Sequence, residues 1–479
     1  MADIRVLQRQ IRELEAQMAE HRAVNDSVYS DDGTRAARDF GESVVMSSAP
    51  EEDTGLVSGF SEHVDVSENQ NTTHPEDVSQ QPSEAGSHSR IPEALVNTRV
   101  SSPDANDERG CEMQVYGATS LLHDRDSGAF WTTPKSIETE SDTATKSATQ
   151  DRLISQAALS SQKETLLYST PRIAENIDFD GLPPDMAMHL LDLHWNRLHL
   201  TYLLTYRPAI MDSLLDNGPY VNKLLLNAIY LQSSLYSNRD GLRLDPHDRQ
   251  STGMAFYNRF KDLLPQYIDQ PTMPTVVGLL LCGACLVPYG KQSAGWVYCG
   301  IAYRMMLDLG YHLDIPSASE REGKFRLSST DAEIRRRVYW GAYANDKFQS
   351  LYLGRPPAVP ISDCNIPQEY LDSYEEMAIW RPYTDPLAPQ HFDQTLSSYR
   401  GRPSYAISTF QCFLQLSMIT EQLIGTFYSV KSARTPESSL LNARRETRDR
   451  LRLWKISLPA HLKFEASKDP TPPPHQVAL

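Results

Sequence analysis

The sequence has few cysteines and no tight cluster of them. Six are spread from Cys111 to Cys412, and only Cys282 and Cys285 form a Cys-x2-Cys pair. A structural zinc site takes four ligands, and no second pair lies near this one. Because the pair lies in an apolar segment, we expect two thiols buried in a core. The start of the chain, MADIRVLQRQ, has no apolar secretory signal, so the cysteines indicate free thiols in a reducing compartment.

Long apolar runs and catalytic motifs are also missing. The longest apolar run, VVGLLLCGACLV at residues 276–287, has 12 residues, whereas a helix that crosses a bilayer needs about 20. The sequence contains no Walker A, GxSxG or GxGxxG motif, and it pairs no two carboxylates as general acid and base. We therefore expect no membrane partner, no catalytic residue, no bound cofactor and no enzyme activity.

Three histidines lie on one expected helix without the spacing of a metal site. His189, His194 and His199 follow one another at intervals of five residues. Each step of five turns about 140° around an α-helix, so the three rings are not expected to converge on one metal ion. The sequence therefore predicts no metal-binding residue.

The negative charge of the chain is confined to one segment. The formal net charge is −16; residues 25–165 carry 26 acidic and 10 basic side chains, whereas residues 166–479 carry 32 of each. A polar, acidic segment of this kind cannot bury enough apolar surface to offset the entropy of ordering, so we predict a disordered linker over residues 25–165. The neutral remainder has no net field that would attract nucleic acid.

A heptad pattern precedes this linker. Apolar side chains recur at spacings of three and four residues, and polar side chains fill the other positions. β-branched residues at a and leucine at d favour a parallel pair of helices. We predict that residues 1–24 dimerise as a coiled coil; the alternative is an amphipathic helix packed on its own chain. The dimerisation residues are Ile4, Leu7, Ile11, Leu14 and Met18.

From about residue 166 the apolar period becomes that of helices. Proline and glycine fall mostly between the periodic segments, and no period of strands appears. The sequence therefore predicts an all-α fold, an irregular multi-helix domain over residues 166–479 preceded by the short coiled coil and the long acidic linker. The expected helices are 186–206, 220–236, 252–268, 275–287, 294–312, 330–353, 404–431 and 437–456.

The stretch RRRVYWGAYANDKFQSLYLGRPPAV, residues 335–359, joins three arginines to an aromatic run. Thr330 and Glu333 predict a capping box at the start of its helix. Gly354, followed by Pro356, predicts the end of the helix. Between these points the helix is apolar on nearly all sides, which is typical of a buried helix.

The arginines at the start of this helix have local partners. Asp331 lies four residues before Arg335, and Glu333 lies four before Arg337. This acid-first order is the favourable one for helical ion pairs. A neutralised cluster in a neutral domain is a poor candidate for binding phosphates, so we expect an interior helix and not a basic arm for nucleic acid.

Two more side chains of this helix need partners. Arg336 has Trp340 at i+4, and we expect the guanidinium to stack on the indole. Asp346 lies within the apolar part, where an unpaired carboxylate is costly. We expect it to pair with Arg355 at the end of the helix or with Arg304 on another helix.

Parts of the helical region resemble the middle homology region of fungal binuclear zinc cluster (Zn2Cys6) transcription factors. The blocks are GWVYCGIAYRMMLDLGYHLD at 295–314, the segment from IRRRVYWG to NIPQEY at 334–370, and LRLWKISLPAHLKF at 451–464. The segment LLDLHWNRLHLTYLLTYRPAI at 190–210 is similar to the opening block of regulators of the nitrogen-assimilation type. The residues that match the family's structural signature are Trp296, Gly300, Arg304, Gly310, His312, Arg336, Trp340, Asp346, Gly354, Arg355 and Pro356.

The resemblance implies a transcription regulator of RNA polymerase II genes, such as a metabolic or biosynthetic gene set. It implies a nuclear protein that forms a homodimer or heterodimer through residues 1–24 and has DNA as a partner. Control would come from a small-molecule effector between helices or from a protein partner. No nuclear import signal is visible in the sequence, so a cytoplasmic location stays open.

The resemblance does not extend to the family's zinc cluster, in which six closely spaced cysteines hold zinc. This chain has no such segment, so zinc is implied only for a cluster outside it, and the helical domain is expected to be incomplete at its C-terminus. Two alternatives remain open. One is a cluster-less paralogue that heterodimerises with a DNA-binding relative and restrains it. The other is a helical scaffold or enzyme without a recognisable site.

Overall fold

The computed structural model describes residues 98–101, 114–117, 140–169, 174–315, 327–387, 399–464 and 472–479. All of them belong to one compact unit, residues 89–479. The predicted coiled coil and most of the predicted linker lie outside the described residues. The coiled-coil residues concerned are Ile4, Leu7, Ile11, Leu14 and Met18.

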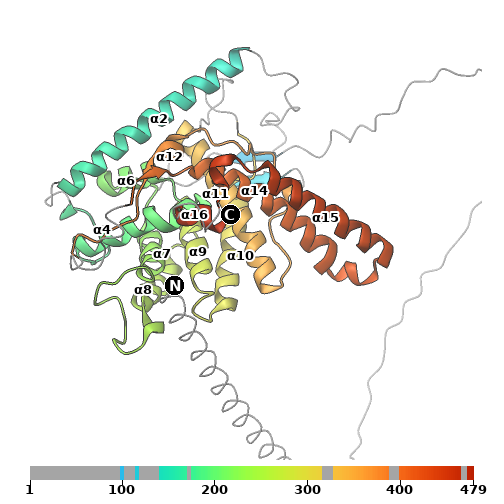
Figure 1. Cartoon of the computed structure of the whole chain (residues 1–479). Coiled ribbons are helices and arrows are strands. Elements are labelled where there is room, and N and C mark those ends of the chain that lie inside the picture. Colours follow the sequence, from blue (N-terminus) through green and yellow to red (C-terminus); the bar gives the residue numbers. More distant parts are fainter. Residues whose placement is uncertain are drawn as a thin grey trace, which may run out of the picture. The chain divides into compact units, whose positions relative to one another are not determined.

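Helices dominate the described part of the chain, so the all-α prediction is confirmed (Figure 1). Within the described residues, strands occur only as two antiparallel pairs. They are β1 (Thr98–Ser101) with β2 (Gln114–Gly117), and β3 (Ile379–Trp380) with β4 (Arg402–Pro403). None of the helices in these ranges combines the length and the apolar character that crossing a bilayer requires.

Most of the expected helices are present with ends shifted by a few residues. They are α7 (Lys223–Ser234), α8 (Met254–Leu263), α9 (Met273–Cys285), α10 (Gln292–Asp308), α11 (Ser329–Leu353), α14 (Ala406–Leu423) and α15 (Glu437–Ser457). The short helical turns between them are η3 (Arg249–Ser251), η4 (Leu264–Gln266), η5 (Ile361–Asp363), η6 (Ile424–Tyr428), η7 (Val430–Arg434) and η8 (Ala460–Leu462).

The helix expected over residues 186–206 is divided into three parts. These are α4 (Pro184–Leu193), a π-helical turn η2 (His194–Leu198) and α5 (His199–Tyr202). Leu203 then turns the chain with φ +50°. Helix α6 (Arg207–Asp216) follows and was not predicted, because Pro208 suggested a break. Proline is in fact compatible with the first turn of a helix, where its missing N–H costs no hydrogen bond.

Helix α9 lies between α7 and α10, and nearly all of its side chains are buried (Figure 1). Glycine permits the contact with α10. A Cβ added to Gly295 would lie only 2.4 Å from the carbonyl oxygen of Gly283. The two backbones therefore approach more closely than any larger residue would allow.

Helix α11 packs against α5, α9, α10 and α14. Between Ile334 and Ser350, only Arg336 and Phe348 are not fully buried. A Cβ on Gly341 would lie 2.6 Å from the Tyr202 carbonyl oxygen, so glycine also permits the approach of α5. The prediction that this segment is an interior helix is confirmed.

The start of α11 differs from the prediction. Ser328, and not Thr330, is the N-cap, and its side-chain oxygen accepts a hydrogen bond from the Asp331 N–H at 3.0 Å. The cap therefore lies two residues earlier than expected. Gly354 ends the helix with φ +65°, as predicted.

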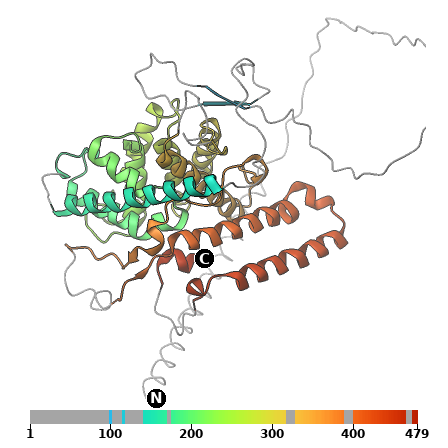
Figure 2. The ribbon, with the colours of Figure 1, turned by 90° about the horizontal axis from the view of Figure 1, so that it is seen from above.

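Helix α2 (Glu140–Ser169) crosses the predicted boundary between linker and domain at residue 165. It lies on the outside of the domain, against α6 and against α12 (Tyr374–Met377), in both views (Figures 1 and 2). The linker prediction is therefore wrong for residues 140–165. The sequence did not predict this helix, because only a narrow stripe of its side chains is buried and apolar periodicity is therefore weak. The buried side chains are those of Leu153, Ala157, Ser160, Glu164 and Leu167.

Helices α14 and α15 form a hairpin that extends beyond the other helices (Figure 2). Helix α15 packs only lightly, since Thr447 is its one buried residue, and Leu453 and Ile456 are 66% and 71% exposed. The short helix α16 (Pro474–Ala478) packs against α14 and α5.

Asp346 of α11 is buried and paired, but with a different partner from those predicted. Its carboxylate accepts from Lys347 Nζ at 2.9 Å and from the backbone N–H groups of Ala358 and Val359 at 3.0 Å. Both Asp346 and Lys347 are 0% exposed. Arg355 instead lies over the Trp296 ring. The carboxylate thus anchors the segment that follows the helix.

Replacing Asp346 is expected to destabilise the domain strongly. Asp346→Ala leaves the buried Lys347 ammonium with only the more distant Glu421 carboxylate, at 3.9 Å, and breaking a buried pair in this way typically costs about 3–5 kcal/mol of the free energy of unfolding. Asp449→Ala, at an exposed position of α15, is the matched control and should change stability by less than about 1 kcal/mol. Urea denaturation of the full chain, followed by circular dichroism, measures both. Equal stability of the two variants would contradict the assignment.

Candidate functional site

A network of buried charges centres on Arg337 of α11. Its Nε donates to Glu333 at 2.8 Å, and its Nη1 donates to Glu375 of α12 at 2.8 Å. Its Nη2 donates to the backbone carbonyl oxygen of Asp372 at 2.9 Å. Arg337 and Glu333 are both 0% exposed. The guanidinium therefore connects α11 to the segment that leads into α12 and to α12 itself.

The second oxygen of Glu333 extends this connection. It accepts a hydrogen bond from the Leu371 backbone N–H at 2.7 Å. The guanidinium of Arg337 also lies over the rings of Tyr206 and Tyr370, 4.8 and 5.2 Å from their centroids. Aromatic faces of this kind stabilise a desolvated cation.

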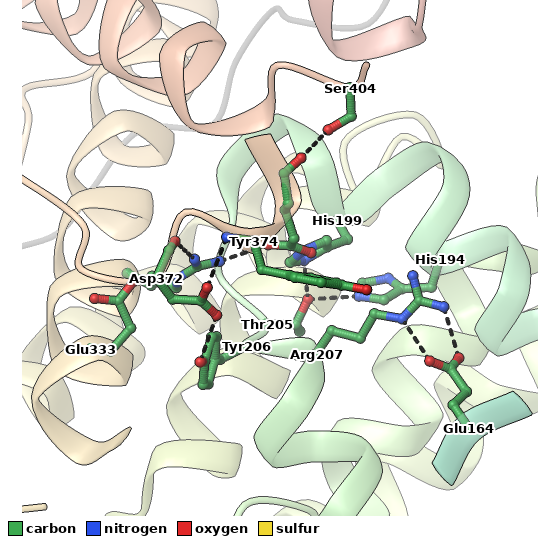
Figure 3. Close-up of polar contacts among 12 residues, drawn as sticks. Glu164, His194, His199, Thr205, Tyr206, Arg207, Glu333, Asp372, Tyr374 and Ser404 are labelled. Carbon is green, nitrogen blue, oxygen red and sulfur yellow. Dashed lines mark hydrogen bonds and ion pairs between the residues drawn. The ribbon is translucent and has the colours of Figure 1, made fainter. Parts of the chain in front are cut away.

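Two histidines extend the network towards the π-helical turn. His199 Nε2 donates to Glu375 at 2.8 Å, and His199 Nδ1 lies 2.8 Å from the hydroxyl of Thr205. The same hydroxyl lies 2.9 Å from His194 Nε2. A continuous chain of hydrogen bonds therefore runs from Arg337 to His194. Figure 3 shows its last part, from His199 through Thr205 to His194.

The π-helical turn explains why these two rings meet. The spacing of an α-helix did not predict that His194 and His199 would meet, but their ring centroids are 6.2 Å apart. A π-helical turn repeats every five residues and so places them on one side. His189 lies elsewhere and contacts the Tyr383 hydroxyl and Ser237.

Electrostatics fix the charge of the network. Burial raises the pKa of Glu375, but the charges and hydrogen bonds of His199 and Arg337 outweigh it and hold that pKa well below its usual range. Burial lowers the pKa of Arg337, yet the neighbouring carboxylates raise it well above its usual value. Burial, with the charges of His199 and Arg207, holds the pKa of His194 well below 6.5. The carboxylate and guanidinium are thus ionised, and His194 is neutral.

A cavity of about 300 Å³ adjoins this network. Its walls come from α2, the π-helical turn, the start of α6, and the segment from α12 through β3. Arg207 lines it and donates to Glu164 of α2 from Nε at 3.1 Å and from Nη2 at 2.7 Å. Glu375 lines it as well, so the cavity and the charge network share a wall.

The three arginines differ in their surroundings. Arg335 donates to the Leu309 carbonyl oxygen at 2.9 Å and lies over the Tyr311 ring, so its predicted pair with Asp331 does not form. Asp331 accepts from the Tyr220 hydroxyl instead. The pair of Glu333 with Arg337 is confirmed.

Arg336 does not stack on Trp340 as expected. Its Nη1 reaches the Glu369 carbonyl oxygen at 3.3 Å, and the side chain is half-buried. The indole Nε1 of Trp340 donates to the Pro367 carbonyl oxygen at 2.9 Å. Both residues thus hold the segment after α11, and Arg335, Arg336 and Arg337 do not form an open cluster.

The remaining signature residues lie at the ends of α10 and α11. Gly310 ends α10 with φ +68°, and Pro356 follows Gly354 beyond α11. The guanidinium of Arg355 lies 5.3 Å from the Trp296 ring centroid, so these two residues meet. These contacts support a structural role for the signature.

Three signature residues make few contacts. Gly300 faces open space, and Arg304 is exposed. His312 accepts a hydrogen bond from the Asn365 N–H through its carbonyl oxygen, and its ring Nδ1 is buried without a partner among the described residues. Burial lowers the pKa of His312.

The thiols of Cys282 and Cys285 are buried in α9, as predicted. Burial raises the pKa of Cys285 to about 12, so this thiol is protonated near neutral pH. No three His, Cys, Asp or Glu side chains of the described residues are grouped as metal ligands.

The sequence did not indicate His194, His199, Thr205, Asp372 or Glu375 as members of one network. His199 and Glu375 are separated by 176 residues, so no local spacing relates them. Glu375 and its neighbour Glu376, in SYEEM, cannot be told from the many other acidic residues of this chain by their local sequence. Only the resemblance of residues 190–210 to a family block hinted that the histidine segment matters.

Comparison with known proteins gives a consistent result. The family model described as "Fungal specific transcription factor domain" matches residues 191–456, which include α5 to α14, the charge network and most of α15. No solved structure matches the chain.

Several curated relatives are transcription regulators by name. The nitrogen assimilation transcription factor nit-4 of Neurospora crassa is 29% identical over 289 residues, which are 58% of this chain and 25% of that protein. The nitrogen assimilation transcription factor nirA of Emericella nidulans is 27% identical over 309 residues, 61% of this chain and 33% of that protein. An uncharacterised transcriptional regulatory protein of Schizosaccharomyces pombe is 40% identical over 212 residues, 42% of this chain and 57% of that protein. The matched part of the chain thus spans a quarter to a third of the length of the first two relatives.

Breaking the charge network should be costly. Arg337→Met leaves Glu333 buried and unpaired, so we expect a loss of about 3–5 kcal/mol of the free energy of unfolding. The neighbouring variant Arg336→Met is the matched control, because Arg336 is half-buried and makes one long hydrogen bond, and it should cost about 1 kcal/mol or less. Urea denaturation compares them. A similar loss in both variants would show that Arg337 has no special role.

The buried histidines predict a loss of stability in mild acid. Burial, with the charge of Arg239, lowers the pKa of His189 to about 4, and burial lowers that of His475 to about 4. Between pH 6.5 and 4 the unfolded chain binds protons that the folded chain does not. The free energy of unfolding should therefore fall as pH falls, by about 1.4 kcal/mol per pH unit for each histidine.

Unfolding measured from pH 7.5 to 4.5 tests this slope. His189→Gln and His475→Gln should each flatten it, whereas His247→Gln, at an exposed loop position, should leave it unchanged. A slope that neither buried substitution alters would contradict the prediction.

Proposed function

Because the chain belongs to the family of the fungal specific transcription factor domain, we propose that it regulates transcription in the nucleus through this helical domain. The observation that carries the proposal is the family match over residues 191–456. The names of the relatives nit-4 and nirA, both nitrogen assimilation transcription factors, support a metabolic set of RNA polymerase II genes as the target.

In this proposal the described domain controls activity and does not itself bind DNA. Arg337 is fully buried in ion pairs, and Arg335 is 7% exposed and bonded to a backbone carbonyl oxygen. Nucleic-acid binding draws much of its affinity from basic side chains that reach phosphates. Arg335 and Arg337 are therefore unavailable to phosphates, and this proposal assigns DNA association to residues outside the described domain.

The proposed organisation has three parts. Residues 1–24 pair two subunits, as a homodimer or a heterodimer, through their heptad seam. The acidic segment from residue 25 to about 139 spaces this pair from the domain. The regulatory domain starts with α2 at residue 140, since α2 packs against α6 and α12. No catalytic role is proposed for any residue.

A tethered reporter experiment tests the function. Residues 1–479 are fused to an unrelated DNA-binding module, and a reporter gene with intermediate basal expression carries the site of that module. We expect the fusion to change reporter expression in one direction relative to the module alone. The fusion carrying Arg337→Met should lose this effect, because the domain is destabilised, whereas the fusion carrying Arg336→Met should keep it.

Subunit pairing is read out in the same cells. Two differently tagged copies should co-purify, and Leu7→Pro together with Leu14→Pro should abolish the pairing, because proline breaks a helix interior. Unchanged reporter expression from a stable, nuclear fusion would contradict the proposed regulation.

A further inference from the structure

The cavity beside the charge network has the walls of a small-molecule site. Its volume of about 300 Å³ is at the lower end of the range for ligand pockets. Aromatic side chains line it from two elements: Trp195 from the π-helical turn, and Tyr374, Trp380 and Tyr383 from the segment around α12 and β3. Polar and charged side chains line much of the rest, so this cavity is more polar than most ligand pockets.

One wall carries a buried donor without an acceptor. Trp195 is 3% exposed, and its indole Nε1 has no hydrogen-bond partner among the described residues. By contrast, Nε1 of Trp340, Trp380 and Trp454 each donates to a backbone carbonyl oxygen at 2.9 Å. A buried N–H without an acceptor is unfavourable, so this one calls for an explanation.

The charged side chains that line the cavity are Glu164, Asp192, Arg207, Glu375 and Arg381. Arg207 and Glu164 neutralise each other in a bidentate pair, which Figure 3 shows. Glu375 is paired with His199 and Arg337. The guanidinium of Arg381 lines the cavity, is exposed, and has no ion pair with a described residue. The cavity thus offers a free cation together with a buried donor.

We propose that this cavity binds a small aromatic carboxylate that carries a hydrogen-bond acceptor at the end opposite its carboxylate. The carboxylate pairs with Arg381, the ring packs among the tryptophan and tyrosine side chains, and the acceptor receives the N–H of Trp195. Arginine is well suited to a planar carboxylate. The site rests on the proposed function, in which this ligand is the effector of the regulatory domain.

The position of the cavity gives binding a structural consequence. The ligand would contact α2 on one side, where Ala157 and Ser160 line the wall, and β3 on the other. Arg207 and Glu164 already connect α2 to α6. A ligand shifts an equilibrium only by its differential affinity for two states. This one favours the state in which α2 is docked on the domain.

Binding is tested with three matched probes on the purified full chain. The probes are 4-hydroxycinnamate, cinnamate, which lacks the ring hydroxyl, and 4-hydroxycinnamyl alcohol, which lacks the carboxylate. Titration calorimetry should show saturable binding of one 4-hydroxycinnamate per chain. Each of the other probes should bind roughly 10-fold more weakly, since each loses one hydrogen-bonded group.

Two variants test which residue contacts each end of the ligand. Arg381→Gln should weaken 4-hydroxycinnamate and cinnamate roughly 10-fold or more and leave the alcohol unaffected. Trp195→Phe should weaken 4-hydroxycinnamate and leave cinnamate unaffected, and its thermal unfolding reports whether it stays folded. Arg434→Gln, at an exposed position of η7, is the control and should change nothing.

Several outcomes would overturn the proposal. They are the absence of saturable binding of both carboxylates, an affinity that Arg381→Gln leaves unchanged, and equal affinities for all three probes. The first outcome means that the cavity binds neither carboxylate, and the other two mean that binding does not use the proposed contacts. The tethered reporter distinguishes this failure from failure of the proposed function. An active reporter without binding overturns the ligand site alone, whereas binding with a silent reporter overturns the regulatory role.

Discussion

The domain depends on the requirement that every charge carried into its core by α11 be paired there. This helix is buried on nearly all sides, yet Glu333, Arg337, Asp346 and Lys347 lie within it at 0% exposure. Unpaired charges at such depth would cost more than the domain's marginal stability allows. The partners are therefore required. Some lie in α11 itself, as in the pairs of Glu333 with Arg337 and of Asp346 with Lys347, and others come from later segments, such as Glu375.

Those partners explain how the irregular segment after α11 is held. Asp346 binds the N–H groups of Ala358 and Val359, and Glu333 binds that of Leu371. Arg337 then joins Glu375, which forms both a link to the histidines and a wall of the cavity. A ligand in that cavity would consequently act next to the groups that hold the core together.

The features that depend on neighbouring residues in the chain could be predicted from the sequence. The buried character of α11, its end at Gly354 and the pair of Glu333 with Arg337 follow from spacing within one helix. The partner of Asp346 did not, because a neighbouring lysine that turns inward has no signature. The meeting of His194 and His199 depends on a π-helical turn, which ordinary helical periodicity does not predict. Helix α2 was missed because only a narrow stripe of it is buried.

The most direct test is amide hydrogen exchange at Leu371, Ala358 and Val359, measured on the full chain. These amides lie outside helices and strands, and each is bonded to a buried carboxylate of α11. If paired charges hold this segment, the three amides will exchange slowly, at the rate of the amides in the core of α11. Rapid exchange at all three while α11 stays protected would contradict the account.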